Sequence, residues 1–248
     1  MNNILILLLA GASKRFNYKT KKQFITINNK PLYCYSLDTF LSTKKIHKVL
    51  LVINKNDKDS EYIKFLYANY KIYFNKDIFH IVYGGKERYN SVYNALQYLK
   101  DNNIVKATSK ILIHDSSRPF VTKIDILNTI TALDKYKSVT LAQTVTNTIK
   151  IVKNIKNLQV DYTPDRKLLY EIYTPQGFIF KYIYDAYNKF MASKKYINIT
   201  DDLQIIEMFS NVKSYLILGD RNNIKITYRD DIDMFFSYKT NIKHPKNT

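Results

Sequence analysis

A short polar loop that follows the first apolar run of the chain carries residues that could bind phosphate. The segment "AGASKRF" (10–16) comes after "ILILLL" and combines a glycine turn with Arg15, and Lys22 follows it closely. Successive backbone N–H groups in such a turn bind phosphate, a guanidinium grips it with a planar fork and an ammonium adds a point charge. The loop matches neither the P-loop pattern nor the dinucleotide fingerprint, which excludes these common nucleotide motifs. Taken alone, it is at least equally consistent with a solvated turn.

Two further segments have the same position after an apolar run. In "GGKERYNSV" (84–92) the paired glycines permit close backbone approach, and Ser91 could hydrogen-bond a base edge. A tight turn that opens a helix explains those glycines equally well. In "IHDSSRPF" (113–120) Asp115 is a hard oxygen ligand suited to Mg²⁺ held jointly with substrate phosphates, and Arg118 could grip a second phosphate. His114 is expected to pack or to orient a neighbour, because no other His or Cys lies at metal-binding spacing.

The elements that must position these segments follow an alternating order. Apolar runs typical of buried strands alternate with helical patterns, which predicts an α/β, Rossmann-like fold with a mostly parallel sheet and helices on both faces. Ligands gather at the carboxyl ends of the strands in such sheets, where the three segments lie. The expected strands are 4–10, 49–54, 79–83, 111–114, 138–142 and 213–218. The expected helices begin after Pro31 and run over 57–70, 88–100, 124–135, 179–190 and 201–209, with a last one from about Asp230.

The segment 144–165 has a different pattern. Apolar residues alternate there with polar interruptions, in the sequence "TVTNTIKIVKNIKNLQVDYTPDR". This alternation indicates a hairpin-like arm rather than part of the compact sheet.

Composition bounds the class of protein. A hydrophobic content of 46% with 14% aromatic residues excludes a disordered chain. The longest apolar run is about half the length that spans a bilayer, and no basic region precedes it, so we expect neither a membrane span nor a signal peptide. The single Cys34 cannot form an internal disulfide. A cytoplasmic protein is the expectation.

The net charge of +18 is the feature that favours a nucleic-acid partner. The lysines are spread along the chain rather than clustered in an arm or helix, and the abundance of Lys, Asn, Ile and Tyr is typical of an AT-rich coding sequence. A basic cleft for a small polyanion is therefore favoured, with no nucleic acid and no membrane as partner.

The order and spacing of the motifs resemble those of the 2-C-methyl-D-erythritol 4-phosphate cytidylyltransferase family. The resemblance runs from Ile4 to about Asp233. Its carriers are "LAGASKRF…KKQF" (9–24), "KPLYCYSL" (30–37), "GGKERYNSV", "HDSSRPFV", "TVTNTIK" (144–150), "DRKLLYEIYTPQGF" (165–178), "TDD" (200–202) and "GDRNNIKIT" (219–227).

The resemblance implies transfer of a cytidylyl group from CTP to methylerythritol phosphate, with Mg²⁺ or another divalent cation as cofactor. It implies one nucleotidyltransferase domain over 1–240, including an arm at about 143–171 that is exchanged in a homodimer, and a loose tail over 241–248. It assigns Arg15, Lys22, Asp115 and Lys225 to catalysis, with Asp115 as the metal ligand. The implied nucleotide-binding residues are Ala10, Gly11, Ala12, Ser13, Gly84, Gly85, Ser91 and Asp115, and the implied substrate-binding residues are Arg118, Thr148, Arg166, Thr200 and Lys225.

The sequence departs from the family pattern at two places. Family members usually read LAAGxGxR, whereas Leu9 and Ser13 stand here for an alanine and a glycine, and Ser116-Ser117 stands for Ala-Ala. These changes bear on loop geometry and affinity more than on the reaction. Ribitol-5-phosphate cytidylyltransferases share the nucleotide motifs and are the alternative, and a basic RNA-associated protein is the alternative from another class. The "DRKLLYEIYTPQ" and "TDD" stretches favour methylerythritol phosphate.

Overall fold

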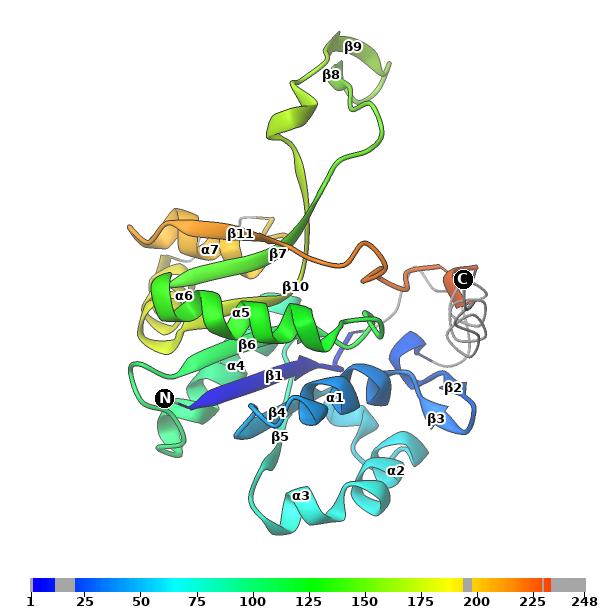
Figure 1. Ribbon diagram of the computed structural model, residues 1–248, viewed down its shortest axis with the longest axis vertical. Helices are drawn as coiled ribbons and strands as arrows, with labels where there is room; N and C mark the ends of the chain where they lie inside the picture. The colour runs from blue at the N-terminus through cyan, green and yellow to red at the C-terminus, as the bar shows by residue number, and fades with distance from the viewer. Residues whose placement is uncertain (1, 12–20, 194–197, 229, 233–248) are drawn as a thin grey trace, which may run out of the picture.

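A seven-stranded sheet forms the centre of the molecule (Figure 1), a computed structural model that describes residues 2–11, 21–193, 198–228 and 230–232. The strand order is β11-β7-β10-β6-β1-β4-β5. In chain order the strands are β1 (Asn3–Leu8), β4 (Lys48–Ile53), β5 (Phe79–Tyr83), β6 (Lys110–Asp115), β7 (Ser138–Thr144), β10 (Tyr170–Ile179) and β11 (Ser214–Leu218). The mostly parallel α/β sheet expected from the alternating pattern is confirmed.

Helices cover both faces of this sheet. They are α1 (Tyr33–Ser42), α2 (Glu61–Asn69), α3 (Lys71–Asn75), α4 (Arg88–Asp101), α5 (Lys123–Lys135), α6 (Phe180–Ser193) and α7 (Asp202–Phe209). Alternate β1 side chains face opposite ways: Ile4 and Ile6 pack with residues of α4 and α6, whereas Leu5 and Leu7 pack with residues of α1 and α5. The unbroken apolar run at the start of the chain is therefore explained by burial on two sides.

The parallel register brings the chemistry-bearing segments to one edge. Leu8 at the end of β1 lies opposite Asp115 at the end of β6, and Leu8 also lies opposite Val52 near the end of β4. Ile53 lies opposite Tyr83, immediately before the glycine pair. The loops after β1, β4, β5 and β6 consequently share the carboxyl edge of the sheet.

One strand was missed by the sequence analysis. The segment around "YEIYTPQGFI" forms β10, which lies between β6 and β7 and runs antiparallel to both. The set of strands expected from the sequence, which has none over 170–179, was therefore incomplete. A proline and a glycine interrupt the apolar pattern of β10, and the ladder with β7 is irregular between Ile172 and Gln176, so local periodicity does not identify this strand.

The helix expected over 57–70 is also different. A 3₁₀ turn at Lys55–Asp57 precedes α2, and Tyr70 separates α2 from the short α3. Another 3₁₀ turn (Lys22–Phe24) and a small hairpin of β2 (Thr26–Ile27) and β3 (Lys30–Pro31) fill the loop before α1. The helix expected from about Asp230 falls mostly on residues outside the described ranges, as does the tail over 241–248.

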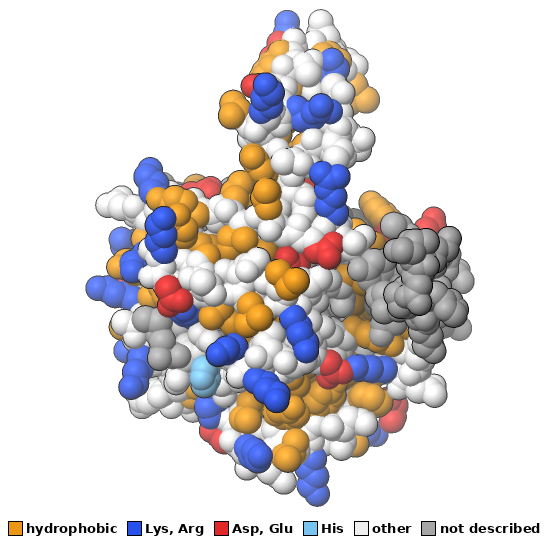
Figure 2. All heavy atoms as spheres, in the orientation of Figure 1, with side chains coloured by type: hydrophobic (Ala, Val, Ile, Leu, Met, Phe, Trp, Pro, Cys, Tyr) orange, Lys and Arg blue, Asp and Glu red, His pale blue; other side chains and the backbone are white. Residues whose placement is uncertain are grey.

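The expected hairpin projects from the body of the molecule (Figure 1). It consists of β8 (Ile151–Asn154) and β9 (Gln159–Tyr162), and the 3₁₀ turn Arg166–Leu168 returns the chain to β10. Apolar side chains lie at its surface, including Ile155 at 84% and Leu168 at 79% exposure (Figure 2). None of the helices in the described ranges is long and apolar enough to cross a membrane.

Candidate active site

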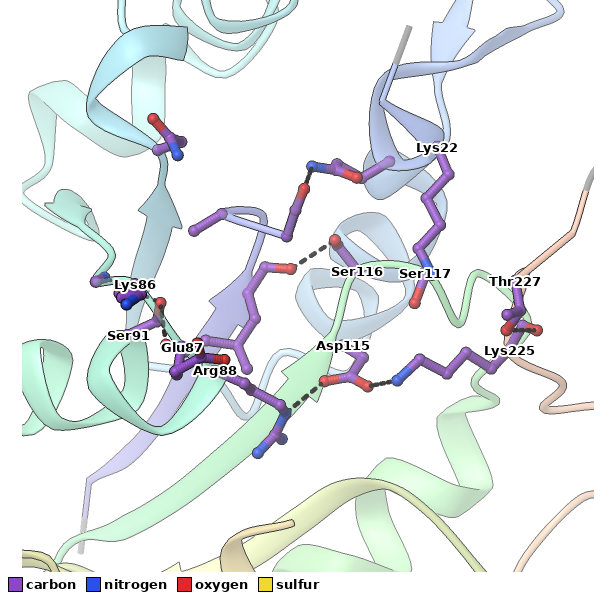
Figure 3. Close-up of a pocket in the computed structure, with 16 residues that line it drawn as sticks. Lys22, Lys86, Glu87, Arg88, Ser91, Asp115, Ser116, Ser117, Lys225 and Thr227 are labelled. Atoms are coloured by element: carbon purple, nitrogen blue, oxygen red, sulfur yellow. Dashed lines mark hydrogen bonds and ion pairs between the residues drawn. The ribbon is translucent and has the colours of Figure 1, made fainter. Parts of the chain in front are cut away.

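A pocket of about 510 Å³ opens at the carboxyl edge of the sheet (Figure 3). Seven of the residues expected in the site line it, namely Ala10, Gly11, Lys22, Gly85, Ser91, Asp115 and Lys225. Residues from the loops after β1, β5, β6 and β11, together with the turn around Lys22, thus meet in one place although they are up to 215 positions apart in sequence. The sheet register described above is what brings them together.

Asp115 lies at the centre of the charged part of this pocket. Its Oδ2 is 2.6 Å from Nζ of Lys225, and its Oδ1 is 3.2 Å from Nε of Arg88 (Figure 3). Burial favours the protonated acid, but Arg88 and Lys225 outweigh it and hold the pKa of Asp115 well below its usual range. The carboxylate is therefore ionised at any physiological pH.

Ile226 positions Lys22 and Lys225, two of the three lysines that line the pocket. Its side chain is fully buried with Ile27 and Leu32, its N–H donates to the carbonyl of Ser117 at 2.9 Å, and its carbonyl accepts from Nζ of Lys22 at 2.9 Å. The residue before Ile226 is Lys225. One apolar anchor therefore holds Lys22 and Lys225 on the same side of the pocket.

The glycine pair after β5 lies against the loop after β1. A Cβ added to Gly84 would be 2.6 Å from Cβ of Ala10 and 2.7 Å from Oγ of Ser91, closer than real side chains approach. The N–H of Gly85 donates to Oγ of Ser91 at 3.1 Å. Gly84 therefore permits a close approach of two loops, a Cβ on Gly85 would be 2.4 Å from Cβ of Asn90 in α4, and Ser91 fixes the turn as well as lining the pocket.

Gln23 links the loop after β1 to the turn that carries Lys22. Its side-chain amide donates to the carbonyls of Leu9 and Gly11, at 2.7 and 2.9 Å. The described end of the first loop is thereby tied to the 3₁₀ turn that carries Lys22. Ala12, Ser13 and Arg15 lie outside the described residues, so their expected roles stay predictions.

The serines that replace the family's alanines have visible partners. The hydroxyl of Ser116 donates to the carbonyl of Leu8 at 2.6 Å, which joins the exits of β6 and β1. Ser117 accepts the N–H of Ile226 at its backbone carbonyl, and both serines line the pocket. The hydroxyl of Ser116 therefore adds a link between the two strand ends, whereas the contact at Ser117 is made by the backbone and does not depend on the side chain.

His114 and Arg118 are buried beneath the site and do not line the pocket in this structure. The ring of His114 has Arg118's carbonyl 3.0 Å from Nε2 and the hydroxyl of Thr174 3.0 Å from Nδ1. Burial lowers the pKa of His114 to about 4, so the ring is neutral and orients its neighbours. The guanidinium of Arg118 donates to the carbonyl of Asn223 at 2.8 Å and lies 4.8 Å from the ring centre of Tyr173.

The remaining expected substrate residues lie away from the pocket. Thr148 and Arg166 are exposed on the arm, where Nη1 of Arg166 donates to the carbonyl of Thr146 at 2.9 Å. Thr200 is exposed just before α7 and bonds Gln204. In its described part, a single chain therefore brings together the expected catalytic residues and the expected nucleotide residues except Gly84, which lies next to the pocket wall. Of the expected substrate residues only Lys225 lines the pocket, whereas Arg118, Thr148, Arg166 and Thr200 do not.

Arg88, which lines the pocket and pairs with Asp115, is the main site residue that sequence reasoning missed. It is the first residue of α4, where the helix dipole disfavours a cation. A cation at that position indicates carboxylate partners, and this was the available signal. Gln23, Asn54, Lys86, Glu87, Ser116, Ser117 and Thr227 also line the pocket and were not assigned to it.

The site fits a divalent cation that is bound partly by the protein and partly by a substrate phosphate. Within the described residues there is no group of three or more His, Cys, Asp or Glu side chains that could hold a metal by themselves. Mg²⁺ is commonly bound through one or two carboxylates together with substrate phosphates, and Asp115 supplies one ionised carboxylate beside the cations that phosphates require. The donor set therefore fits a metal that arrives with a phosphate ligand.

Comparison with known proteins identifies the family. Residues 3–237 match the family model of 2-C-methyl-D-erythritol 4-phosphate cytidylyltransferase. A curated relative of that name from Clostridium botulinum is 37% identical over 227 residues, which cover 92% of this chain and 94% of the relative. One from Thermosipho melanesiensis is 32% identical over 93% of this chain and 94% of its own.

Solved structures agree with the sequence comparison. A crystal structure described as 4-diphosphocytidyl-2C-methyl-D-erythritol synthase from Anaerococcus prevotii superposes with a TM-score of 0.79 at 32% identity, over 96% of this chain and 98% of that one. The family model matches nearly the whole chain, and the relatives and the solved structure agree with it. The chain belongs to the 2-C-methyl-D-erythritol 4-phosphate cytidylyltransferase family.

Proposed function

We propose that the protein joins CTP and 2-C-methyl-D-erythritol 4-phosphate to give CDP-methylerythritol and pyrophosphate. The observation that carries the proposal is the arrangement of Lys22, Lys225 and Arg88 around the ionised Asp115, beside a glycine-built turn at the carboxyl edge of the sheet. Such a site is built for a polyanion rather than for a proton transfer. The family membership supplies the identity of the two substrates.

The reaction needs charge stabilisation more than acid–base chemistry. The substrate's phosphate oxygen is already an anionic nucleophile, which attacks the α-phosphorus of CTP while the bond to the pyrophosphate oxygen breaks. The protein must bring two polyanions together and stabilise the charge on a five-coordinate phosphorus. Lys22 and Lys225 point their ammonium groups into the pocket from fixed backbone positions, so they can bind and orient these phosphates (Figure 3).

The nucleotide's base is assigned to the pocket wall made by Ala10, Gly85 and Ser91, with Gly84 packed against Ala10 and Ser91 next to that wall. The close approach at Gly84 leaves little room between the two loops, which favours a pyrimidine over a purine. Asp115 would hold Mg²⁺ or another divalent cation together with the α-phosphate. When bound, the cation would neutralise phosphate charge.

The substrate's own contacts are proposed to come from two subunits. Arg118 and Thr200 belong to the chain that binds CTP, whereas Thr148 and Arg166 lie on the projecting arm and are carried to the site of a second copy. The exposed apolar side chains of the arm support this homodimer, because a two-stranded hairpin with such a surface is marginally stable in water alone.

The direct test is pyrophosphate release with CTP and Mg²⁺, with methylerythritol phosphate and ribitol 5-phosphate offered in parallel. We expect turnover with methylerythritol phosphate, loss of turnover in excess EDTA, and a preference for CTP over ATP and GTP of at least about 100-fold. Preferential use of ribitol 5-phosphate would establish the alternative reaction, and equal turnover of ATP would exclude the proposed base pocket. Salt-dependent binding of random RNA that CTP does not displace would favour the RNA-associated alternative.

A further inference from the structure

A buried carboxylate behind the pocket has no part in the chemistry described so far. Asp202, the first residue of α7, is fully buried and does not line the pocket. Its Oδ1 accepts the hydroxyl of Tyr187 at 2.5 Å, and its backbone N–H donates to Oε1 of Gln176 at 3.1 Å. Its Oδ2 accepts from Nη2 of Arg88 at 2.8 Å. Burying a charged group costs free energy unless the group is paired. The role of Asp202 is therefore to be sought in its charged partner, Arg88.

Arg88 connects this carboxylate to the pocket. The same planar guanidinium donates through Nη2 to Asp202 and through Nε to Oδ1 of Asp115, at 2.8 and 3.2 Å. Burial opposes the charge of Arg88, but Asp202 and Asp115 outweigh it and raise the pKa of Arg88 above its ordinary value. Because the guanidinium is rigid, the bond to Asp202 at one corner sets the direction of the N–H at another.

The contact with Asp202 prevents Arg88 from forming a bidentate pair with Asp115. An arginine beside a single carboxylate favours a bidentate pair, in which two parallel N–H groups bond both oxygens. Asp115 needs one oxygen for Lys225, and the proposed reaction needs the same carboxylate for a divalent cation. A bidentate pair with Arg88 would compete for both oxygens. The contact with Asp202 holds Arg88 to a single bond with Asp115.

We propose that Asp202 is a positioning residue for Asp115, acting through Arg88 and held in place by Tyr187 and Gln176. The inference rests on the proposed function, since it concerns the same site. It extends the active site from the carboxyl end of β6 to the start of α7. Neither the "HDSSRPFV" motif with Asp115 nor the "TDD" motif with Asp202 shows this connection by itself. Asp202 touches no substrate and acts by keeping Arg88 from occupying Asp115.

The first experiment is Asp202→Asn, which keeps the shape of the side chain and removes its charge. We expect kcat to fall by about 10- to 100-fold, and the Mg²⁺ concentration for half-maximal rate to rise by about tenfold, the range that supporting partners of metal ligands contribute. The KM for CTP at saturating Mg²⁺ should change less than threefold or so, because the base pocket is untouched. Calorimetric titration with CTP, in Mg²⁺ and in EDTA, should show that the variant loses the metal-dependent gain in affinity.

A matched control separates positioning from general loss of an ion pair. Lys110, at the opposite end of β6, is buried and pairs with Asp134 at 2.6 Å. Asp134→Asn removes a carboxylate partner of a cation, as Asp202→Asn does, but at the amino end of the strand and at a carboxylate that is 66% exposed, whereas Asp202 is fully buried. We expect it to leave kcat and the Mg²⁺ requirement at wild-type values. A change of the same size in both variants would overturn the inference.

A double-mutant cycle tests the route through Arg88. If Asp202 acts only through Arg88, then Arg88→Gln and the double variant Arg88→Gln/Asp202→Asn should have the same kcat within about threefold. Losses that multiply would show that Asp202 acts independently and would overturn the proposal. Tyr187→Phe removes one bond to Asp202 and keeps its charge, so it should shift the Mg²⁺ requirement in the same direction by a smaller factor of about 2 to 3.

Turnover by the wild-type enzyme tests the proposed function, whereas the kcat and Mg²⁺ requirement of Asp202→Asn test the positioning role. Absence of turnover in a folded wild-type enzyme contradicts the proposed function. Wild-type turnover with an unchanged kcat and Mg²⁺ requirement in Asp202→Asn contradicts the positioning role alone. If circular dichroism shows that Asp202→Asn does not fold, Tyr187→Phe decides the matter, and an unshifted Mg²⁺ requirement in that variant overturns the proposal.

Discussion

At the scale of one residue, the fold keeps the carboxylate of Asp115 ionised. Its carboxylate is nearly enclosed yet ionised, because Arg88 and Lys225 approach one oxygen each. Arg88 comes from the start of the helix that precedes β6, whereas Lys225 lies 110 positions after Asp115 in the sequence. The arrangement keeps an acceptor at the strand end with a fixed orientation and a constant charge.

Asp115→Asn tests that reading. The substitution keeps the size of the side chain but leaves Arg88 and Lys225 without their shared anion and removes the metal ligand. We expect kcat/KM to fall at least about 100-fold, the scale of losing one preorganised charge, measured by pyrophosphate release well below the melting temperature. Near-normal turnover with a lowered melting temperature would assign Asp115 a structural role only.

The same variant has a pH signature. Because the folded-state pKa of Asp115 is depressed, its contribution to stability is present above the unfolded value of about 4 and is lost as the pH falls through and below that value. The difference in unfolding free energy between wild type and Asp115→Asn should therefore be constant at neutral pH and shrink below about pH 4. Denaturant titrations at several pH values measure it.

At the scale of elements, the site depends on two loops that touch. The turn after β5 can approach the loop after β1 because Gly84 has no side chain, and Ser91 from α4 fills the remaining space. Strand register aligns these loops, but the absence of a Cβ sets their separation. The width of the proposed base pocket is thus a property of packing between elements.

Gly84→Ala should widen that contact and weaken nucleotide binding. A Cβ at 2.6 Å from that of Ala10 forces the loops apart, at a cost of about 1 to 3 kcal/mol in unfolding free energy. We expect the KM for CTP to rise severalfold, measured by initial rates. Gly177→Ala is the matched control, because Gly177 lies in β10 and does not line the pocket, and its Cβ would be 2.8 Å from Cγ2 of Thr129 in α5. It should lower the melting temperature and leave the KM for CTP unchanged. An unchanged KM in Gly84→Ala would refute the tight wall.

At the scale of the whole molecule, a single chain leaves the proposed site incomplete. The pocket contains Lys22 and Lys225, whereas Arg166 lies on the arm with an exposed apolar surface around it. An isologous dimer would place each arm beside the partner's pocket and cover that surface. The arm would then be stabilised by assembly rather than by its own two strands.

Mixing two inactive variants tests shared sites. Lys22→Ala damages the subunit's own pocket, and Arg166→Ala damages the partner's, so each homodimer should be nearly inactive. After joint unfolding and refolding, about half of the dimers are mixed, and each has one intact site. We expect roughly a quarter of wild-type activity to return. Proven mixed dimers without recovery would show that each site is built within one chain.

The alternation of apolar runs and helical patterns was sufficient to predict a mostly parallel α/β sheet, and the segments that carry Asp115 and Gly84 were correctly placed at one edge of that sheet. Local pattern carries this information because buried strands and amphipathic helices have distinct periods, and because parallel strands end at a common edge. The antiparallel β10 was missed for the same reason, since Pro175 and Gly177 interrupt the pattern and only its neighbours β6 and β7 define it as a strand.

Tertiary structure alone decided which charges meet. Nothing in the spacing of Arg88, Asp115 and Asp202 along the chain indicates that one guanidinium joins two carboxylates, because ion pairs depend on distances of a few ångströms between elements folded from separate segments. The pocket position of Lys225 likewise depends on the burial of its neighbour Ile226 among Ile27 and Leu32. The sequence by itself determined the family, the sheet and the residues available for chemistry. Only the packing of strands and helices determined their partners, orientation and ionisation.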